Sequence, residues 1–314
     1  MDYVLLVIGF ILLIKGADFF VEGSASVARK LKVPSFIIGM TIVAMGTSAP
    51  ECAVSVTASL KNSNALAISN VVGSNIFNLM VVCGVCALLV PLTIDMSTLK
   101  REFPFSILVG LLLLGFGAWG MKVGHIDGIV LLVIFALFLF VMVKDAMKHR
   151  KEAGQIEEAE EEEIKILPMY QCIFYILIGV VAIVGGGDLV VDSASEIARQ
   201  FGMSQTLIGL TIVACGTSLP ELVTSFVAAR KNEVDMALGN VIGSNIFNIL
   251  LIIGIAATIS PIAVTMENII DLSVMSAMSL LVYVFTLRDQ KIGKMQGALM
   301  LLVYVGYIVY TCVR

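Results

Sequence analysis

The sequence predicts an all-α membrane protein, with ten transmembrane helices arranged as two inverted repeats of five helices each. Three observations lead there: an apolar composition, ten long apolar runs, and a pair of polar motifs that occurs twice. Of the 314 residues, 59% are hydrophobic and 14% are charged, and the mean hydropathy is +1.00. Charged residues make up about a quarter of soluble globular domains. The composition therefore excludes a soluble domain.

The apolar runs are long enough to cross a bilayer, which takes about 20 residues per helix. They cover residues 2–22, 36–60, 66–90, 103–120, 125–145, 168–190, 206–229, 236–258, 268–287 and 295–312. Met1 to Tyr3 carries no positive charge, so we expect the first run to remain as a helix and not to be a cleaved signal peptide. The connections between runs leave no room for a separate soluble domain.

The distribution of lysine and arginine predicts the orientation, because cytoplasmic loops are enriched in these residues. With the N-terminus outside, 15 of them fall on the cytoplasmic side and 4 on the outer side. We therefore expect a multi-pass protein of the plasma or inner membrane. The acidic linker 146–167, which contains the run Glu157 to Glu163, would be cytoplasmic.

The chain consists of two copies of one unit, related by a shift of 170 positions. GMTIVAMGTSAPE from Gly39 matches GLTIVACGTSLPE from Gly209, and NVVGSNIFN from Asn70 matches NVIGSNIFN from Asn240. The predicted boundaries are 1–145 for the first repeat, 146–167 for the linker and 168–314 for the second repeat. Since each repeat holds five spans, the second enters the membrane from the opposite side. Inverted repeats are typical of secondary transporters, which bind their substrate at the midplane between repeats.

Two glutamates at equivalent repeat positions, Glu51 and Glu221, lie in the second and seventh apolar runs. An ionised carboxylate inside a bilayer is expensive and is therefore a candidate functional group. Lys15 is the only basic residue within a predicted span, so no salt bridge is available to either glutamate. The sequence thus indicates that a cation from solution is their partner.

The neighbours of both glutamates are oxygen donors. Thr47 and Ser48 precede Glu51 by four and three residues, which places all three on one helical face, and Thr217 and Ser218 precede Glu221 in the same way. The prolines before both glutamates interrupt the helix and free backbone carbonyl groups. Hydroxyl, carboxylate and carbonyl oxygens are the ligands that Ca²⁺ prefers.

The second motif adds a polar stripe to an otherwise apolar helix. The stripe consists of Asn70, Ser74 and Asn78 in the first repeat and of Asn240, Ser244 and Asn248 in the second. In each repeat the three residues are four positions apart, so they lie on the same side of a helix. We expect two asparagines to face the two glutamates, so that four side chains converge on a small pocket.

GTSAPE and GTSLPE, each followed by GSNIFN, resemble the alpha repeats of the cation/calcium exchanger superfamily, and the nearest type is the small prokaryotic sodium/calcium exchangers. The resemblance covers essentially the whole chain. It implies an antiporter that exchanges three Na⁺ for one Ca²⁺ and is electrogenic. It further implies these ion ligands: Glu51, Glu221, Thr47, Ser48, Ser74, Asn78, Thr217, Ser218 and Ser244 through side chains, and Ala44 and Ala214 through backbone carbonyls. Asn248 departs from relatives with aspartate there, which argues against K⁺ cotransport.

Three other functions remain open at this point. A calcium/proton exchanger would use the same glutamates as proton carriers, and the hydroxyl groups around them favour sodium. A passive channel would need no counter-ion, whereas inverted repeats and proline-broken helices favour alternating access. An intramembrane enzyme would need a water-activating motif, so we predict no enzyme. The expected partners are Na⁺, Ca²⁺ and the lipid bilayer, with no cofactor, no nucleic acid and no obligate protein partner.

Overall fold

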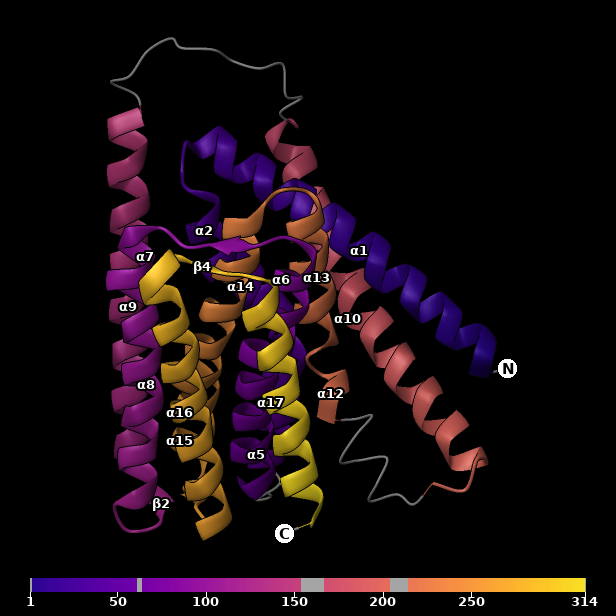
Figure 1. Cartoon of the computed structure of the whole chain (residues 1–314), viewed down its shortest axis with the longest axis vertical. Helices are drawn as coiled ribbons and strands as arrows, with labels where there is room; N and C mark the ends of the chain where they lie inside the picture. Colours follow the sequence, from indigo (N-terminus) through magenta and orange to yellow (C-terminus); the bar gives the residue numbers. More distant parts are fainter. Residues whose placement is uncertain (1, 61–63, 154–166, 204–213, 314) are drawn as a thin grey trace.

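The computed structural model describes residues 2–60, 64–153, 167–203 and 214–313, which form a bundle of helices (Figure 1). Eight of the described helical segments are long and apolar enough to cross a membrane, and a bent pair of shorter helices makes a ninth if it is taken as one span. The prediction of an all-helical membrane protein is confirmed. The predicted run 206–229 begins outside the described residues, as does the motif from Gly209, so the total of ten remains a prediction.

Two halves of similar element order make up the described chain. The first contains α1 (Asp2–Leu31), α2 (Ser35–Ile38), η1 (Gly39–Val43), α3 (Ala44–Thr47), α4 (Ala49–Leu60), α5 (Asn64–Phe77), η2 (Asn78–Val82), α6 (Cys83–Leu89), β1 (Leu92–Thr93), α7 (Met96–Lys100), α8 (Glu102–Ala118), β2 (Lys122–Val123) and α9 (His125–Ala153). The second contains α10 (Met169–Gln200), α12 (Ala214–Gly216), α13 (Leu219–Arg230), α14 (Val234–Phe247), η4 (Asn248–Ile253), α15 (Gly254–Ile259), β3 (Ile262–Ala263), α16 (Met266–Asp289), β4 (Lys291–Ile292) and α17 (Lys294–Val313). The η segments are π-helical turns.

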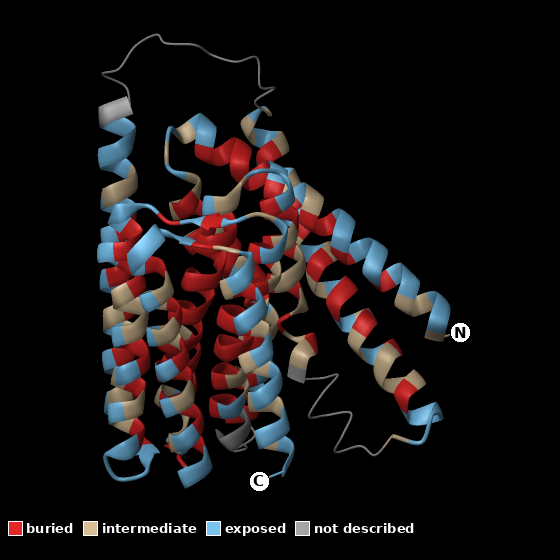
Figure 2. Ribbon diagram, viewed as in Figure 1, coloured by how far each residue is buried: buried red, intermediate tan, exposed pale blue. Residues whose placement is uncertain are grey.

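Two continuous spans form the centre of the molecule: α5–η2–α6 and α14–η4–α15. Their most apolar windows are 78% buried, whereas those of the other single-helix spans are 11–39% buried. Figure 2 shows the same contrast, with buried residues gathered on the inner helices and exposed ones on the outer helices. The exposed residues of the outer helices include many large apolar side chains, as expected where helices face lipid.

α1 and α10 lie side by side at a slant to the upright helices (Figure 1). Glycines let their backbones approach closely. A Cβ on Gly16 would lie 2.9 Å from the Ile183 amide nitrogen, and one on Gly186 would lie 2.8 Å from the Leu13 amide nitrogen. Such contacts between small residues are typical of helix association in membranes, and they indicate that α1 and α10 form one unit.

Short strands link the two halves. β1 pairs with β4, with Leu92 opposite Ile292, and β2 pairs with β3, with Lys122 opposite Ala263; both pairs are antiparallel. Each strand of one half therefore pairs with a strand of the other half. This reciprocal pairing joins the halves outside the helical core.

Candidate ion-binding site

A break in each glutamate-bearing helix positions the carboxylates. The segments Ser35–Thr47 and Ala49–Leu60 meet at a bend of 50°, and Ser48 at the break has φ −80° and ψ 10°. Ser218, between α12 and α13, has φ −95° and ψ 6°. As a result, Glu51 and Glu221 stand in the first turn of a helix, where the helix dipole stabilises negative charge.

Crossed hydrogen bonds join the two halves at the glutamates. The Ser48 hydroxyl donates to Glu221 Oε1 at 2.8 Å, and the Ser218 hydroxyl donates to Glu51 Oε1 at 3.1 Å. Both glutamates are fully buried, and their carboxyl groups are close enough to interact electrostatically. The structure thus brings together four of the six residues that the two GTSxPE motifs placed on one helical face in each half.

Several buried oxygens around the glutamates have no hydrogen-bond partner in the described part of the chain. They are Glu51 Oε2, Glu221 Oε2, Ser74 Oγ, Ser244 Oγ, Asn78 Oδ1, Asn248 Oδ1 and Thr217 Oγ1. Ser74 lies beside Glu51 and Ser244 beside Glu221. Unsatisfied buried polar groups are costly. So many unpartnered oxygens in one place indicate a ligand that oxygen atoms coordinate. A dehydrated cation is such a ligand.

The charge of the cluster supports the same conclusion. Among the described residues, no lysine or arginine forms an ion pair with Glu51 or Glu221. Two unneutralised carboxylates in a buried site cost several kcal/mol. No group of three or more histidine, cysteine, aspartate or glutamate side chains suited to a metal is present in this part of the chain. The candidate donors at this cluster are two carboxylates and neutral oxygens, a combination that suits Ca²⁺ and Na⁺ better than zinc or copper.

A chain of amides fixes how Asn248 faces the site. The Asn75 amide nitrogen donates to the backbone carbonyl of Asn245 at 3.1 Å, and a carbonyl can only accept. The Asn75 side-chain oxygen therefore points to Asn248, whose Nδ2 donates to it at 3.0 Å. With its nitrogen engaged, Asn248 leaves Oδ1 without a partner. In contrast, neither amide atom of Asn78 is hydrogen-bonded within the described chain.

Asn78 and Asn248 each begin a π-helical turn, η2 and η4. π turns within α-helices are rare and occur frequently at functional sites. The other stripe asparagines lie elsewhere: Asn70 Nδ2 donates to Ser55 at 3.1 Å, and Asn240 Nδ2 donates to Ser225 at 2.9 Å. The predicted stripe is thus divided, with one part at the glutamates and one part bridging to the broken helices.

Three further predicted ligands, Thr47, Ala44 and Ala214, differ in the contacts that the structure gives them. The Thr47 hydroxyl lies 3.1 Å from Asn240 Oδ1 and 3.2 Å from the Val43 carbonyl oxygen. The Ala44 carbonyl oxygen accepts the Ser48 amide at 3.0 Å and lies 3.4 Å from the Thr47 hydroxyl. Ala214 begins α12 directly after the segment 204–213, which lies outside the described residues.

Sequence reasoning did not select four residues that support the site. These are Ser55, Ser225, Asn75 and Asn245. All four recur at the shift of 170 positions, so an exhaustive comparison of polar residues between the repeats would have found them.

Comparisons with known proteins find similar chains over nearly the whole length of this one. The family model for the sodium/calcium exchanger protein matches residues 1–144 and 172–313. CaxA of Alkalimonas amylolytica is 41% identical over 314 residues, which cover 97% of this chain and 96% of that protein. The sodium/calcium exchanger MaX1 of Methanosarcina acetivorans is 32% identical over 355 aligned positions, which cover 98% of this chain and 97% of that protein. The solved structure of the sodium-calcium exchanger NCX_Mj, soaked with Na⁺ and Sr²⁺, superimposes with a TM-score of 0.85 at 35% identity, covering 98% of this chain and 97% of that one.

Proposed function

This chain belongs to the sodium/calcium exchanger family, and from that premise we propose that it moves Ca²⁺ across the membrane in exchange for Na⁺ at Glu51 and Glu221. The observation that carries the proposal is the cluster of unpartnered oxygens around two buried carboxylates that no lysine or arginine neutralises in the described chain. A Ca²⁺ ion brought to this cluster cancels the charge of both glutamates.

The proposed ligands follow from position and from free lone pairs. Glu51 and Glu221 provide the charge, and neutral oxygens complete the coordination. The neutral donors are Thr47, Ser48, Ser74, Asn78, Thr217, Ser218, Ser244 and Asn248 through side chains, with Ala44 and Ala214 through backbone carbonyls. Since Na⁺ and Ca²⁺ use overlapping oxygens, the two ions compete, and this competition couples their movements.

The transport cycle we propose is alternating access. Inverted repeats of five helices, 1–145 and 168–314, would place the N-terminus outside and the linker 146–167 in the cytoplasm. α1 and α10 are the best candidates for the moving part, because they pack on each other and slant away from the central spans (Figure 1). Sliding of this pair past the core would expose the site to one side at a time.

Radiolabelled Ca²⁺ uptake into proteoliposomes tests the function. We expect uptake to require Na⁺ inside the vesicles and to ignore K⁺ and pH gradients. Glu51→Gln and Glu221→Gln should each reduce it at least about 100-fold, because removing one buried carboxylate leaves the bound ion uncompensated by several kcal/mol. Asp289→Asn, at an exposed carboxylate at the end of α16, is the matched control and should transport normally.

Other results would point to other functions. Uptake driven by a pH gradient in place of Na⁺ would identify a calcium/proton exchanger. Uptake that ignores every gradient would indicate a passive channel. Normal uptake by both glutamine variants would exclude the proposed site.

A further inference from the structure

A groove of about 320 Å³ runs between α8 and α9, far from the glutamates in sequence. Its walls are the apolar side chains of Phe105, Ile134, Leu137, Phe138, Val141 and Met142. Phe105 and Phe138 stack at 5.5 Å with their planes 10° apart. Both helices are outer ones, since the spans Met96–Ala118 and His125–Lys151 are 33% and 28% buried. The groove therefore lies where acyl chains surround the protein.

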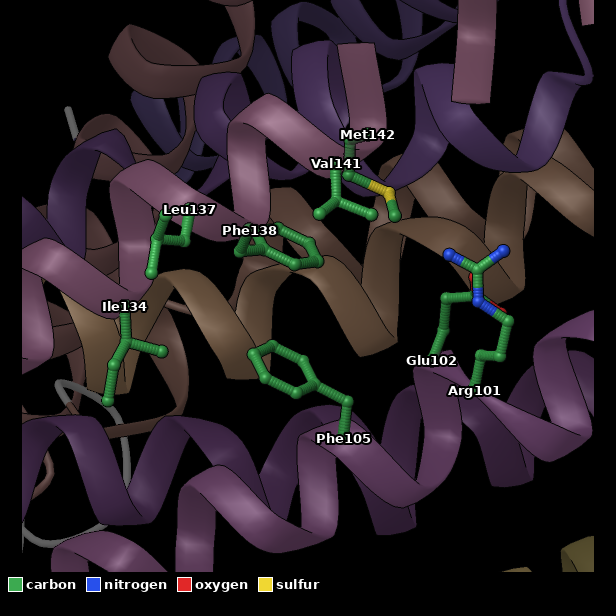
Figure 3. A pocket seen from close by; sticks show the side chains of 8 residues that line it. All are labelled: Arg101, Glu102, Phe105, Ile134, Leu137, Phe138, Val141 and Met142. Atoms are coloured by element: carbon green, nitrogen blue, oxygen red, sulfur yellow. The ribbon is translucent and has the colours of Figure 1, made fainter. Parts of the chain in front are cut away.

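One end of the groove is polar, where Arg101 and Glu102 lie together beyond the apolar walls (Figure 3). Arg101 Nη2 is 2.7 Å from Asp145 Oδ2, and its Nε is 4.0 Å from Glu102 Oε1. The second carboxylate oxygen of Glu102 is buried and has no partner in the described chain. One guanidinium therefore faces two carboxylates, and one carboxylate oxygen lacks a hydrogen-bond donor.

This end of the groove matches a specific head group. Two carboxylates that share one guanidinium favour a further positive charge, and the unpartnered Glu102 oxygen favours an N–H or O–H donor. A primary ammonium supplies both, whereas a quaternary ammonium has no N–H to donate. The side chain of Arg101 is 53% exposed, which leaves guanidinium N–H groups for a neighbouring phosphate.

We propose that the groove between α8 and α9 binds a phospholipid with a primary ammonium head group, phosphatidylethanolamine. One acyl chain lies along the apolar walls, the ammonium contacts Glu102, and the phosphate contacts Arg101. Arginine commonly lies at the head-group level of the membrane, so the groove joins the hydrocarbon region to the polar layer.

The second half of the chain shows that the polar end is not a by-product of the repeat. At the shift of 170 positions, Asp271 stands in the place of Arg101 and Leu272 in the place of Glu102. Asp271 accepts a hydrogen bond from Tyr307 at 3.1 Å. The last spans of the two repeats align at a shift of 169, since Lys122 to Gly124 matches Lys291 to Gly293, and Tyr307 thus corresponds to Phe138 in the groove wall. The second repeat thus has no counterpart of the Glu102 carboxylate, and the neighbouring carboxylate of Asp271 is hydrogen-bonded within the protein, whereas Glu102 Oε2 has no partner in the described chain.

Native mass spectrometry of the delipidated, full-length protein tests the proposal. The protein is titrated with phosphatidylethanolamine, phosphatidylcholine and phosphatidylglycerol of identical acyl chains. We expect about tenfold tighter binding of the ethanolamine lipid than of the other two, as one charge-assisted hydrogen bond to a buried carboxylate provides. Glu102→Leu, which installs the residue of the second repeat, should lower ethanolamine-lipid binding to the level of the choline lipid.

Two further variants make the result specific. Asp289→Asn removes an exposed carboxylate outside the groove and should leave all three affinities unchanged. Leu137→Trp fills the groove and should weaken all three lipids alike. Equal binding of the three lipids, preference for the phosphatidylglycerol, or an ethanolamine preference that survives Glu102→Leu in a monodisperse protein would overturn the proposal. Binding is read without transport, so the outcome is independent of the exchange activity.

Discussion

Asn248 has a fixed orientation at the site, whereas its counterpart Asn78 does not. Asn75 holds the Asn248 nitrogen through a bond of 3.0 Å, and is itself oriented by the Asn245 carbonyl. Asn245 occupies the equivalent position in the second repeat and donates to the Asn75 carbonyl at 3.3 Å, but its side-chain oxygen has no partner in the described chain. The two repeats are thus asymmetric at the residues that complete the site.

This asymmetry predicts different effects of two equivalent mutations. Asn75→Ala should weaken apparent Ca²⁺ affinity by about fivefold, because Asn248 loses the bond of roughly 1 kcal/mol that turns its oxygen toward the ion. Asn245→Ala also removes a hydrogen bond to a backbone carbonyl, that of Asn75, but it leaves the hydrogen bond between Asn75 and Asn248 in place. It should therefore change the Ca²⁺ affinity much less. Ca²⁺ titration of Na⁺-dependent uptake measures both. Equal losses in the two variants would show that Asn75 acts only as a packing residue.

The principal residues of the candidate site could be selected from the sequence, because their chemistry is visible locally. Glu51 and Glu221 are acidic residues in apolar runs, and their hydroxyl neighbours share a helical face with them. The crossing of Ser48 to Glu221 and of Ser218 to Glu51 was not predicted. It depends on how the two broken helices meet, which no spacing within either helix encodes.

At the scale of helices, prolines predicted the breaks but not their form. Pro50 lacks the N–H that would bond the Gly46 carbonyl, and the described chain bends by 50° just before it, at Ser48. The π turns η2 and η4 had no recognised sequence signal. Packing against neighbouring helices determines where a helical turn takes up an extra residue. The residues that determine it are therefore distributed over the whole fold.

The unit formed by α1 and α10 gives a test with neighbouring glycines. A Cβ on Gly186 would lie 2.8 Å from the Leu13 nitrogen and 2.9 Å from the Gly9 carbonyl oxygen, whereas a Cβ on Gly185 would meet nothing within 4 Å. Gly186→Ala should therefore destabilise the protein by about 1–3 kcal/mol through overpacking. Gly185→Ala should be neutral or stabilising, because alanine favours the helix by up to about 1 kcal/mol.

Thermal unfolding in detergent, followed by circular dichroism, distinguishes the two glycine variants. A lower midpoint for Gly186→Ala alone would support close packing of α1 on α10. If the two variants melt at the same temperature, the helices do not depend on this approach of their backbones.

At the scale of the whole molecule, the repeat in the sequence corresponds to a reciprocal arrangement in space. Each two-residue strand of one half pairs with a strand of the other, and each central span is equally buried. The apolar runs predicted the spans because hydrocarbon thickness sets their length. They did not predict the strands, which are too short for an alternating pattern and form only when the halves meet.

The charge of the site links this architecture to the membrane potential. At the proposed site the two glutamates would neutralise one Ca²⁺, and the same oxygens holding three Na⁺ would leave one positive charge. A cycle that moves three Na⁺ out of a vesicle for each Ca²⁺ taken in therefore transfers one positive charge outward. The membrane potential acts on that charge with about 2.3 kcal/mol per 100 mV.

Na⁺-driven Ca²⁺ uptake should consequently depend on voltage. In proteoliposomes with valinomycin, an outward K⁺ gradient makes the interior negative and should slow uptake, whereas an inward gradient makes it positive and should accelerate uptake. At equilibrium the accumulation ratio should change about fiftyfold per 100 mV. The same K⁺ gradients without valinomycin are the control, since they create no comparable potential and exclude a direct effect of K⁺. Uptake that is indifferent to voltage would instead mean that two Na⁺ balance each Ca²⁺ and that the site never carries a net charge across the membrane.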